Sequence, residues 1–329
     1  MKAVVQSSYG SHDVLRVQEV ATPTAGDDEV LVRVYAAAVS ISDTITRTGR
    51  PLFGRVFTGL RRPRRPIKGS EFAGQVEAIG RHVTRFEKGD DVFGSTGSKQ
   101  GCYAEYAGIS EDELAAVKPG RMTYEEAAAV CSALAAWNFL REKADVQIGQ
   151  KVLILGASSS IGTHAIQLAR HFGAHVTGVC RTAALELIES LGADEVIDST
   201  RQDFTGSGET YDIIFDTESE SSYLRCKGSL APNGFYLLTF PGPVILLQML
   251  WTSMIGKKRA VVSATGLLPI AKRRAFLEEV INLVEIGALR SIVDRRYPLD
   301  RIRDAYRRSE GGDTTGTVVV TLSQPPHSA

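Results

Sequence analysis

The sequence predicts an α/β protein in which a doubly wound parallel sheet is joined to a second, β-rich region. Three observations predict this fold class. The segment 151–179 has the pattern of a buried strand, a tight turn of small residues, a helix and a second buried strand. Strand and helix patterns then alternate as far as about residue 262, and the first third of the chain holds short strands separated by glycine-containing turns.

The composition supports a globular chain of two domains. The 329 residues include 43% hydrophobic and 23% charged residues, and the formal net charge is zero. A chain without net charge is not drawn as a whole to nucleic acid or to an anionic membrane. The N-terminus lacks the apolar core of a signal peptide. No C-x-x-C pair occurs among the cysteines, so we expect a cytoplasmic protein without disulfides or a cysteine-bound structural zinc; the four are Cys102, Cys131, Cys180 and Cys226.

The first third of the chain is expected to be rich in β-strands. Val30–Tyr35 and Gly74–Ile79 have strand patterns, and Asp91–Phe93 follows a Lys-Gly-Asp turn. A helix is predicted over Tyr124–Arg141, with Thr123 as its N-cap, because acidic residues occupy the first turn.

The segment after Lys151 resembles a dinucleotide-binding unit. Val152–Leu155 is continuously apolar, as in a strand buried on both faces, and His175–Val179 follows about 20 residues after the turn. Phosphates bind at the N-terminus of the helix between two such strands. Only the third glycine of the G-x-G-x-x-G fingerprint is present, so a βαβ unit without a ligand remains an alternative. The predicted phosphate-binding residues are Ala157, Ser158, Ser159, Ser160, Ile161 and Gly162.

The rest of the chain continues the alternation and then returns to the first region. The predicted elements are a helix at Ala183–Leu191, strands at Glu195–Ile197, Tyr211–Phe215 and Phe235–Thr239, helices at Ala271–Ile286 and near Asp300–Ser309, and a closing strand at Thr317–Leu322. We expect this last strand to join the β-rich domain.

Two segments stand out by composition. Arg61–Lys68 is strongly basic, which favours a solvated loop over a contact with a cofactor phosphate or an acidic partner. Pro243–Ile255 is apolar and too short to span a bilayer. For this segment a buried helix, a dimer contact or a lid over the substrate is favoured over membrane attachment.

Several ordered segments together resemble the medium-chain dehydrogenase/reductase family, in its zinc-free quinone oxidoreductase-like branch. The resemblance implies a GroES-like β-barrel domain over residues 1–122, completed by 264–329, and a Rossmann domain over 123–263, with a substrate cleft between them. The segments that carry it are Met1–Val5, Glu29–Val34, Gly69–Gly74, Lys88–Gly94, Tyr103–Tyr106, Gly149–Ile154, Leu191–Asp194, Tyr211–Asp216 and Leu230–Gly234.

The resemblance also implies that catalytic zinc is absent. Ser40 and Ser70 occupy the positions where zinc-dependent relatives have a cysteine and a histidine, and only Cys131 falls on a third ligand position. A catalytic zinc needs about three protein ligands. Without a Lewis acid the oxidation of an alcohol is disfavoured, and the reduction of a quinone or of an α,β-unsaturated carbonyl is preferred.

In the implied reaction, hydride passes from the nicotinamide to an enone or a quinone. Ser40 is then predicted to donate a hydrogen bond to the substrate oxygen or the nicotinamide ribose, with capping of the backbone as the alternative. Asp43 is predicted to bind the ribose or to order the cleft. Cys131 is predicted to line the cleft, the alternative being a small buried hydrophobic residue.

The end of the second strand indicates the cofactor. Cys180, Arg181 and Thr182 include no acidic residue, and Arg181 and Thr182 suit a 2′-phosphate, so NADPH is favoured while NADH remains possible. Further cofactor contacts are predicted at Thr217, Thr239, Phe240 and Pro241, although Pro241 equally suits a simple turn.

Two other functions remain open: an alcohol or aldehyde dehydrogenase, and a cofactor-binding protein with a structural or regulatory role. The expected partners are a small quinone or enone substrate and a second copy of the chain, but neither nucleic acid nor a membrane. The basic segment 61–68 has no interleaved aromatic residues for base stacking. The homodimer is expected to pair through Phe235–Thr239 as an edge strand of the Rossmann sheet.

Overall fold

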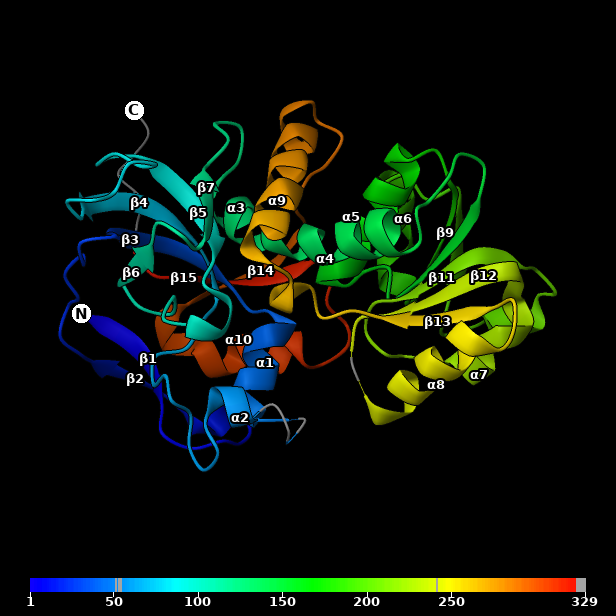
Figure 1. Ribbon diagram of the computed structural model, residues 1–329, viewed down its shortest axis with the longest axis horizontal. Helices are drawn as coiled ribbons and strands as arrows, with labels where there is room; N and C mark the ends of the chain where they lie inside the picture. The colour runs from blue at the N-terminus through cyan, green and yellow to red at the C-terminus, as the bar shows by residue number, and fades with distance from the viewer. Residues whose placement is uncertain (51, 53–54, 241, 324–329) are drawn as a thin grey trace. The chain divides into compact units, whose positions relative to one another are not determined.

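The chain divides into two compact units in a computed structural model that describes residues 1–50, 52, 55–240 and 242–323. Unit 1 contains Met1–Cys131 and the residues from 291 onward, and unit 2 contains Ser132–Arg290 (Figure 1). Unit 1 is the GroES-like domain, and unit 2 holds the six-stranded parallel Rossmann sheet of the predicted α/β fold.

Unit 1 is built on a seven-stranded sheet in the order β14-β15-β3-β4-β5-β7, with β6 paired to β3. The closing strand β15 pairs antiparallel with β3, which confirms that the C-terminal strand joins the first domain. Val32, Val34 and Phe72 pack in the core beneath this sheet. The strands of unit 1 are β1 (Lys2–Gln6), β2 (Leu15–Glu19), β3 (Glu29–Ala38), β4 (Glu71–Ile79), β5 (Asp91–Ser95), β6 (Tyr106–Ser110), β7 (Leu114–Val117), β14 (Val293–Pro298) and β15 (Thr317–Thr321).

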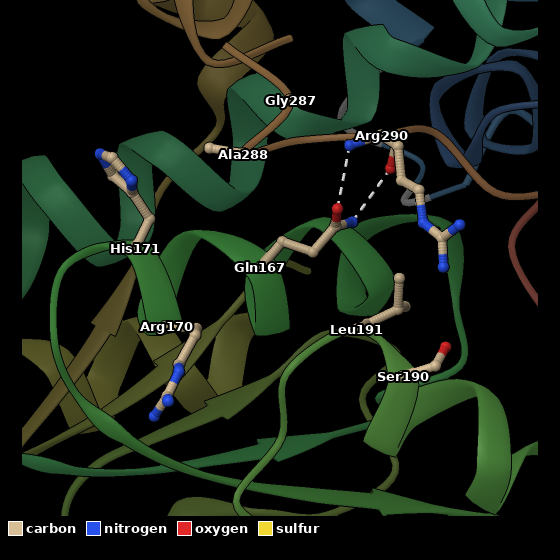
Figure 2. A pocket seen from close by; sticks show the side chains of 8 residues that line it. All are labelled: Gln167, Arg170, His171, Ser190, Leu191, Gly287, Ala288 and Arg290. Carbon is tan, nitrogen blue, oxygen red and sulfur yellow. Dashed lines mark hydrogen bonds between the residues drawn. The ribbon is translucent and has the colours of Figure 1, made fainter.

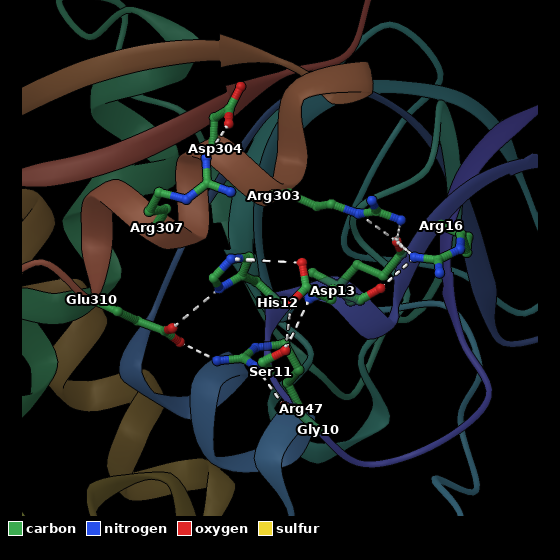
Figure 3. Close-up of polar contacts among 11 residues, drawn as sticks. Gly10, Ser11, His12, Asp13, Arg16, Arg47, Arg303, Asp304, Arg307 and Glu310 are labelled. Atoms are coloured by element: carbon green, nitrogen blue, oxygen red, sulfur yellow. Dashed lines mark hydrogen bonds and ion pairs between the residues drawn. The ribbon is translucent and has the colours of Figure 1, made fainter.

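A buried arginine ties the helices of unit 1 to its N-terminal segment (Figure 3). Arg47, at the end of α1, pairs with Glu310, donates to the carbonyl of Gly10 at 2.6 Å, and lies over the ring of Tyr306. Its side chain is almost completely buried. This arrangement fixes α1, whose N-terminal end carries Ser40 and Asp43. The helices of unit 1 are α1 (Ile41–Thr48), α2 (Arg55–Thr58), α3 (Tyr124–Ala129) and α10 (Ile302–Ser309).

The segment predicted as a helix over Tyr124–Arg141 is helical throughout, but the type of helix changes along it. Thr123 is its N-cap as predicted, and with Glu126 it forms a capping box. The chain then tightens into a 3-10 turn at Val130–Ser132, resumes as α4 (Ala133–Trp137) and widens into a π-helical segment, Asn138–Lys143. The prediction of a helix over this segment is confirmed, although its geometry alternates between α, 3-10 and π. The chain passes from unit 1 to unit 2 after Cys131, within this segment.

The sheet of unit 2 has the order β10-β9-β8-β11-β12-β13 with every pair parallel. This is the doubly wound order in which ligands bind at the carboxyl ends of the strands, where the order reverses between β8 and β11. The elements of unit 2 are β8 (Lys151–Leu155), α5 (Ser160–His171), β9 (His175–Cys180), α6 (Leu185–Ser190), β10 (Glu195–Asp198), β11 (Tyr211–Asp216), α7 (Tyr223–Cys226), β12 (Leu230–Leu238), α8 (Pro243–Met254), β13 (Arg259–Val262) and α9 (Ile270–Glu285).

The predicted edge strand is wrong. Phe235–Thr239 belongs almost entirely to β12, which pairs with β11 on one side and with β13 on the other. The edge of the sheet on this side is β13, and the opposite edge is β10. A homodimer that pairs through Phe235–Thr239 is therefore excluded by the strand order.

The two units also differ in extent from the predicted domains. The sequence placed the boundaries after residues 122 and 263, but the compact units separate after Cys131 and after Arg290. Helix α9 belongs to unit 2 because it packs against α4. Lys272 on α9 pairs with Glu142, and the Asn138 side chain donates to Ser263 Oγ at 3.0 Å.

The two compositionally unusual segments lie mostly on the surface. Arg61, Arg62, Arg64 and Arg65 are exposed, as in a solvated loop, whereas Lys68 is buried. One prediction for the segment 243–255 was a buried helix. The segment does form a helix, α8, but most of its large apolar side chains are exposed, so this prediction is wrong.

Candidate cofactor and substrate sites

The predicted phosphate-binding turn joins β8 to α5. Gly156 has a φ of +67°, which favours glycine, and Ser159 is the N-cap of α5. The Ser159 hydroxyl accepts a hydrogen bond from the Gly162 amide at 2.9 Å. A β-carbon on Gly162 would lie 2.2 Å from the Gly156 carbonyl oxygen, so only glycine permits this close approach. The absence of a side chain on Gly162 thus lets the N-terminus of this twelve-residue helix pack closely against the turn, and such helix N-termini favour phosphate groups.

Thr217, directly after β11, forms hydrogen bonds to this turn. Its Oγ1 lies 2.9 Å from the Leu155 carbonyl oxygen and 2.9 Å from Ser159 Oγ. Thr239, after β12, donates to the Thr217 carbonyl at 2.9 Å. Phe240 follows Thr239 and is partly buried, whereas Pro241 lies outside the described residues. The structure thus brings the predicted residues at the ends of β8, β11 and β12 to one edge of the sheet.

The end of β9 places Arg181 in solvent and ties Thr182 to an acid. Cys180 is buried, and Thr182 Oγ1 donates to Asp198 Oδ2 at 2.6 Å. The hydrogen bonds from Thr182 and Thr200 lower the pKa of Asp198. Sequence reasoning missed Asp198 because it considered acids only at the end of the second strand. Its position at the end of the third strand, β10, was the available signal.

A second acid missed from the sequence is Glu218, two residues beyond β11. Its Oε2 lies 3.3 Å from the position that a β-carbon on Gly156 would occupy, so it lies beside the turn. Burial, helped by Glu220 and Asp216, raises the pKa of Glu218 to about 7, and Arg181 opposes this rise. A carboxyl group that titrates near neutrality thus lies next to the predicted phosphate site.

In unit 1, Ser40 and Asp43 form one hydrogen-bonded group. The Ser40 hydroxyl donates to Asp43 Oδ2 at 2.9 Å and accepts from the Asp43 amide, as the N-cap of α1. The Tyr103 hydroxyl donates to the same carboxylate oxygen at 3.0 Å. Asp43 is completely buried, so its contacts support the ordering role rather than direct binding of a ribose. In this arrangement the Ser40 hydroxyl already donates its proton in a hydrogen bond to Asp43.

Two further ionisable groups beside this cluster were not among the predicted site residues. Burial lowers the pKa of Lys68 to about 8, although Asp43 opposes the shift. Burial raises the pKa of Glu71 well above its usual value, and Asp43 adds to the effect.

Cys131 is 5% exposed. Burial, and to a smaller extent the nearby Glu71, raises the pKa of its thiol well above the usual value. These properties support the interpretation of Cys131 as a small buried hydrophobic residue.

The residues at the zinc positions of related enzymes do not fit a zinc ion. Ser40 and Ser70 meet through their hydroxyl groups at 3.3 Å, and neither is a ligand of the kind that zinc prefers. Among the described residues, His, Cys, Asp and Glu side chains form no group of three that could hold a metal ion.

Unit 2 contains a cavity of about 330 Å³ (Figure 2). It is found where α5 ends, about 18 Å along the helix from Ser159. Gln167 closes one side by a pair of hydrogen bonds with the Arg290 backbone, at 2.9 and 3.0 Å. Arg170 and His171 line it at the C-terminal end of α5, where basic side chains offset the negative end of the helix dipole. This cavity is therefore separate from the predicted cofactor site.

Two family descriptions match the chain. Residues 26–119 match "Alcohol dehydrogenase GroES-like domain", and residues 191–320 match "Zinc-binding dehydrogenase". The second description names a metal, whereas no group of three His, Cys, Asp or Glu side chains that could hold one is found in the part of the chain that the structure describes.

Individual proteins match over nearly the whole chain. The quinone-oxidoreductase homolog of Spinacia oleracea, a chloroplastic protein, is 32% identical over 97% of this chain and 98% of its own. The NADPH-dependent alkenal/one oxidoreductase of Arabidopsis thaliana is 29% identical, over 97% of this chain and 79% of its own. The structure of the quinone oxidoreductase from Coxiella burnetii superposes with a TM-score of 0.83 at 25% identity, over 98% and 99% of the two chains. The chain belongs to the medium-chain dehydrogenase/reductase superfamily, in its quinone oxidoreductase and alkenal/one reductase branch.

Proposed function

We propose that the protein is an NADPH-dependent, zinc-independent reductase of quinones or of the C=C bond of α,β-unsaturated carbonyls. Two observations together carry the proposal: the tight turn before the N-terminus of α5 in unit 2, and the hydroxyl groups of Ser40 and Ser70 at the zinc positions in unit 1. The names of the Spinacia and Arabidopsis relatives support the same substrate class.

The residues of unit 2 fit a bound dinucleotide. Gly156 and Gly162 leave space for a close backbone approach, and the N-terminus of α5 favours the negative charge of a pyrophosphate. Arg181 is free in solvent to pair with a 2′-phosphate, which distinguishes NADPH from NADH. Bound NADPH would supply the hydride for the reduction.

In unit 1 the protein residues would orient the substrate rather than polarise it with a metal. Asp43 accepts hydrogen bonds from Ser40 and Tyr103 and so holds the Ser40 hydroxyl in one orientation. For Ser40 to donate to a substrate oxygen, as the sequence predicts, its proton would have to leave Asp43. Without that rotation, Ser40 offers only its lone pairs, which suits acceptance of a hydrogen bond from a ribose hydroxyl. Addition of hydride to a polarised C=C bond or to a quinone creates an enolate or quinolate oxygen that water can protonate.

The decisive experiment follows the oxidation of NADPH and NADH by protein whose metal content has been measured, before and after treatment with a chelator. Phenanthrenequinone, benzoquinone and short alkenals serve as acceptors. We expect turnover with NADPH that survives chelation. Activity that appears only after zinc is added would instead assign an alcohol or aldehyde dehydrogenase. Tight NADPH binding without turnover of any acceptor would favour the role of a cofactor-binding protein.

A further inference from the structure

Helix α8 exposes an unusually apolar face. Its twelve residues include no charged side chain, and Ile245 and Thr252 are the buried ones that face the domain. At 100° per residue, the exposed large side chains cover about half of the helix circumference. They are Val244, Leu246, Leu247, Leu250, Trp251 and Met254, and Ile255 follows directly after the helix. Apolar residues scattered singly over a surface are common, but a contiguous apolar patch of this kind marks an interaction surface.

The charges around this apolar face are basic. The segment 257–259 that follows α8 reads Lys-Lys-Arg, and residues 243–259 contain no acidic residue. Lys257 and Arg259 are exposed. From the side of α7, Lys227 extends its ammonium group to 5.6 Å from the centre of the Trp251 ring, and the Lys258 side chain bonds to the Lys227 carbonyl. An apolar face thus has a tryptophan and several cations at its border.

A second copy of the chain fits this surface poorly. A twofold dimer would cover the apolar side chains with the same patch of the partner. It would leave the basic border without acidic partners from this segment, because residues 243–259 contain none. An anionic lipid surface meets both requirements, because acyl chains cover the apolar side chains while head groups attract the lysines and arginines.

The dimensions of α8 suit a position on a membrane rather than across it. The helix is about 18 Å long, whereas the hydrocarbon core of a bilayer is about 30 Å thick. Among the described residues, the structure contains no helix with the length and apolarity needed to cross a membrane.

We propose that unit 2 docks on anionic membranes through the exposed apolar face of α8 and its basic border. This inference does not depend on the proposed reaction, although docking would place the protein where apolar quinones and enones dissolve. It also departs from the expectation that the chain has no membrane partner, which followed from a net charge of zero. The even balance over the whole chain conceals a local excess of positive charge beside α8.

The test is co-sedimentation of the full-length protein with vesicles of phosphatidylcholine alone and of phosphatidylcholine with phosphatidylserine. We expect binding to the anionic vesicles that weakens as salt is raised. Leu250→Ser should reduce partitioning roughly tenfold, because one leucine side chain is no longer buried in lipid. Lys257→Gln should reduce it about fivefold, since each basic residue near the surface contributes about that factor.

Two matched controls separate a local effect from a general one. Leu267→Ser removes an even more exposed leucine outside α8, and Lys143→Gln removes an exposed lysine elsewhere in unit 2. Both should bind vesicles like the unmodified protein, and circular dichroism should show that every variant is folded. The proposal is overturned if the protein remains in the supernatant with anionic vesicles, or if the α8 variants bind as the controls do. Self-association that Leu250→Ser abolishes, without any binding to vesicles, would assign the face to a second copy instead.

Discussion

Glu218 is the residue whose charge should respond most strongly to a bound dinucleotide. Its pKa of about 7 means that part of the population is protonated at neutral pH. Pyrophosphate oxygens beside Gly156 would raise this pKa further, so binding should take up a proton. The groups that face Glu218 are Glu220 and Asp216, which favour the protonated form, and Arg181, which opposes it.

We therefore predict that NADPH affinity falls as the pH rises from about 6 to 8, because Glu218 of the unbound protein has then lost the proton that it must regain on binding. Glu218→Gln should bind more tightly at the upper end of this range and lose most of the dependence. Titration calorimetry in buffers of different ionisation enthalpy measures both the affinity and the proton uptake. An affinity that is independent of pH in the unmodified protein would contradict the prediction.

Arg181 should determine the preference for NADPH over NADH. A charge-assisted hydrogen bond to a phosphate contributes about 2 kcal/mol, so Arg181→Ala should weaken NADPH binding roughly thirtyfold and leave NADH binding nearly unchanged. Arg201→Ala is the matched control, because Arg201 is also exposed but pairs with Asp198. Equal losses for both cofactors, or equal effects of both substitutions, would place the 2′-phosphate elsewhere.

The Cys131 thiol should react slowly in the folded protein. Burial raises its pKa well above the usual value, so little thiolate is present at neutral pH. Iodoacetamide should modify Cys131 far more slowly in the native protein than in urea, as measured by mass spectrometry of its peptide. Rapid modification of the native protein, prevented by NADPH, would instead support the prediction that Cys131 lines a substrate cleft.

At the scale of elements, the cap of α3 offers a direct test of a feature visible in the sequence. Thr123 accepts a hydrogen bond from the Glu126 amide, and the Glu126 carboxylate accepts one from the Thr123 amide at 2.8 Å. Thr123→Ala should lower the free energy of unfolding by about 1 kcal/mol. Urea denaturation measures the loss, and Thr123→Ser should retain most of the stability because it keeps the hydroxyl. An equal loss in both variants would show that the methyl group, not the cap, is responsible.

Strands with a strong local sequence pattern could be predicted from the sequence. The strands that pair with them in the sheet could not. The buried strand β8 and its turn follow from a continuous apolar run and small residues. The strand β12 has the same apolar pattern whether it is central or at an edge, so its partners depend on where the following β13 returns. The change to a 3-10 turn after Ala129 could not be predicted either, because an alanine-rich sequence favours a helix without specifying its type.

For the cofactor and substrate residues, too, their positions in the chain were predictable but their contacts with one another were not. The rule that ligands meet the carboxyl ends of parallel strands located the residues at the ends of β8, β9, β11 and β12 in the sequence. It did not reveal that Thr182 is held by Asp198, or that Glu218 lies beside Gly156. These contacts join residues from different strand ends, and their distances depend on the register of the sheet.

At the scale of the whole molecule, the limits of the two units could not be predicted from composition. Helix α9 follows β13 and precedes the return to unit 1, and its sequence suits either unit. Its assignment depends on packing against α4 and on the ion pair between Lys272 and Glu142. Each unit nevertheless buries its own apolar cluster, with Val34 and Phe72 in unit 1 and Leu153 and Ile214 in unit 2.

Separate cores predict that unit 1 can be destabilised without loss of cofactor binding. Arg47→Met leaves Glu310 without its buried partner and the Gly10 carbonyl without its donor. Breaking a buried ion pair in this way typically costs about 3 kcal/mol. We expect the variant to unfold at lower urea concentration while its NADPH affinity stays unchanged.

The matched control for this prediction is Arg307→Met, which removes an exposed arginine from an ion pair with Asp304 on the same unit (Figure 3). An exposed pair contributes at most about 1 kcal/mol, so this variant should unfold almost like the unmodified protein. Differential scanning calorimetry with and without NADPH separates the two units, because a ligand that binds only the folded form of unit 2 raises the unfolding temperature of that unit. If Arg47→Met instead weakens NADPH binding as much as it destabilises unit 1, the two units fold and bind as one cooperative structure.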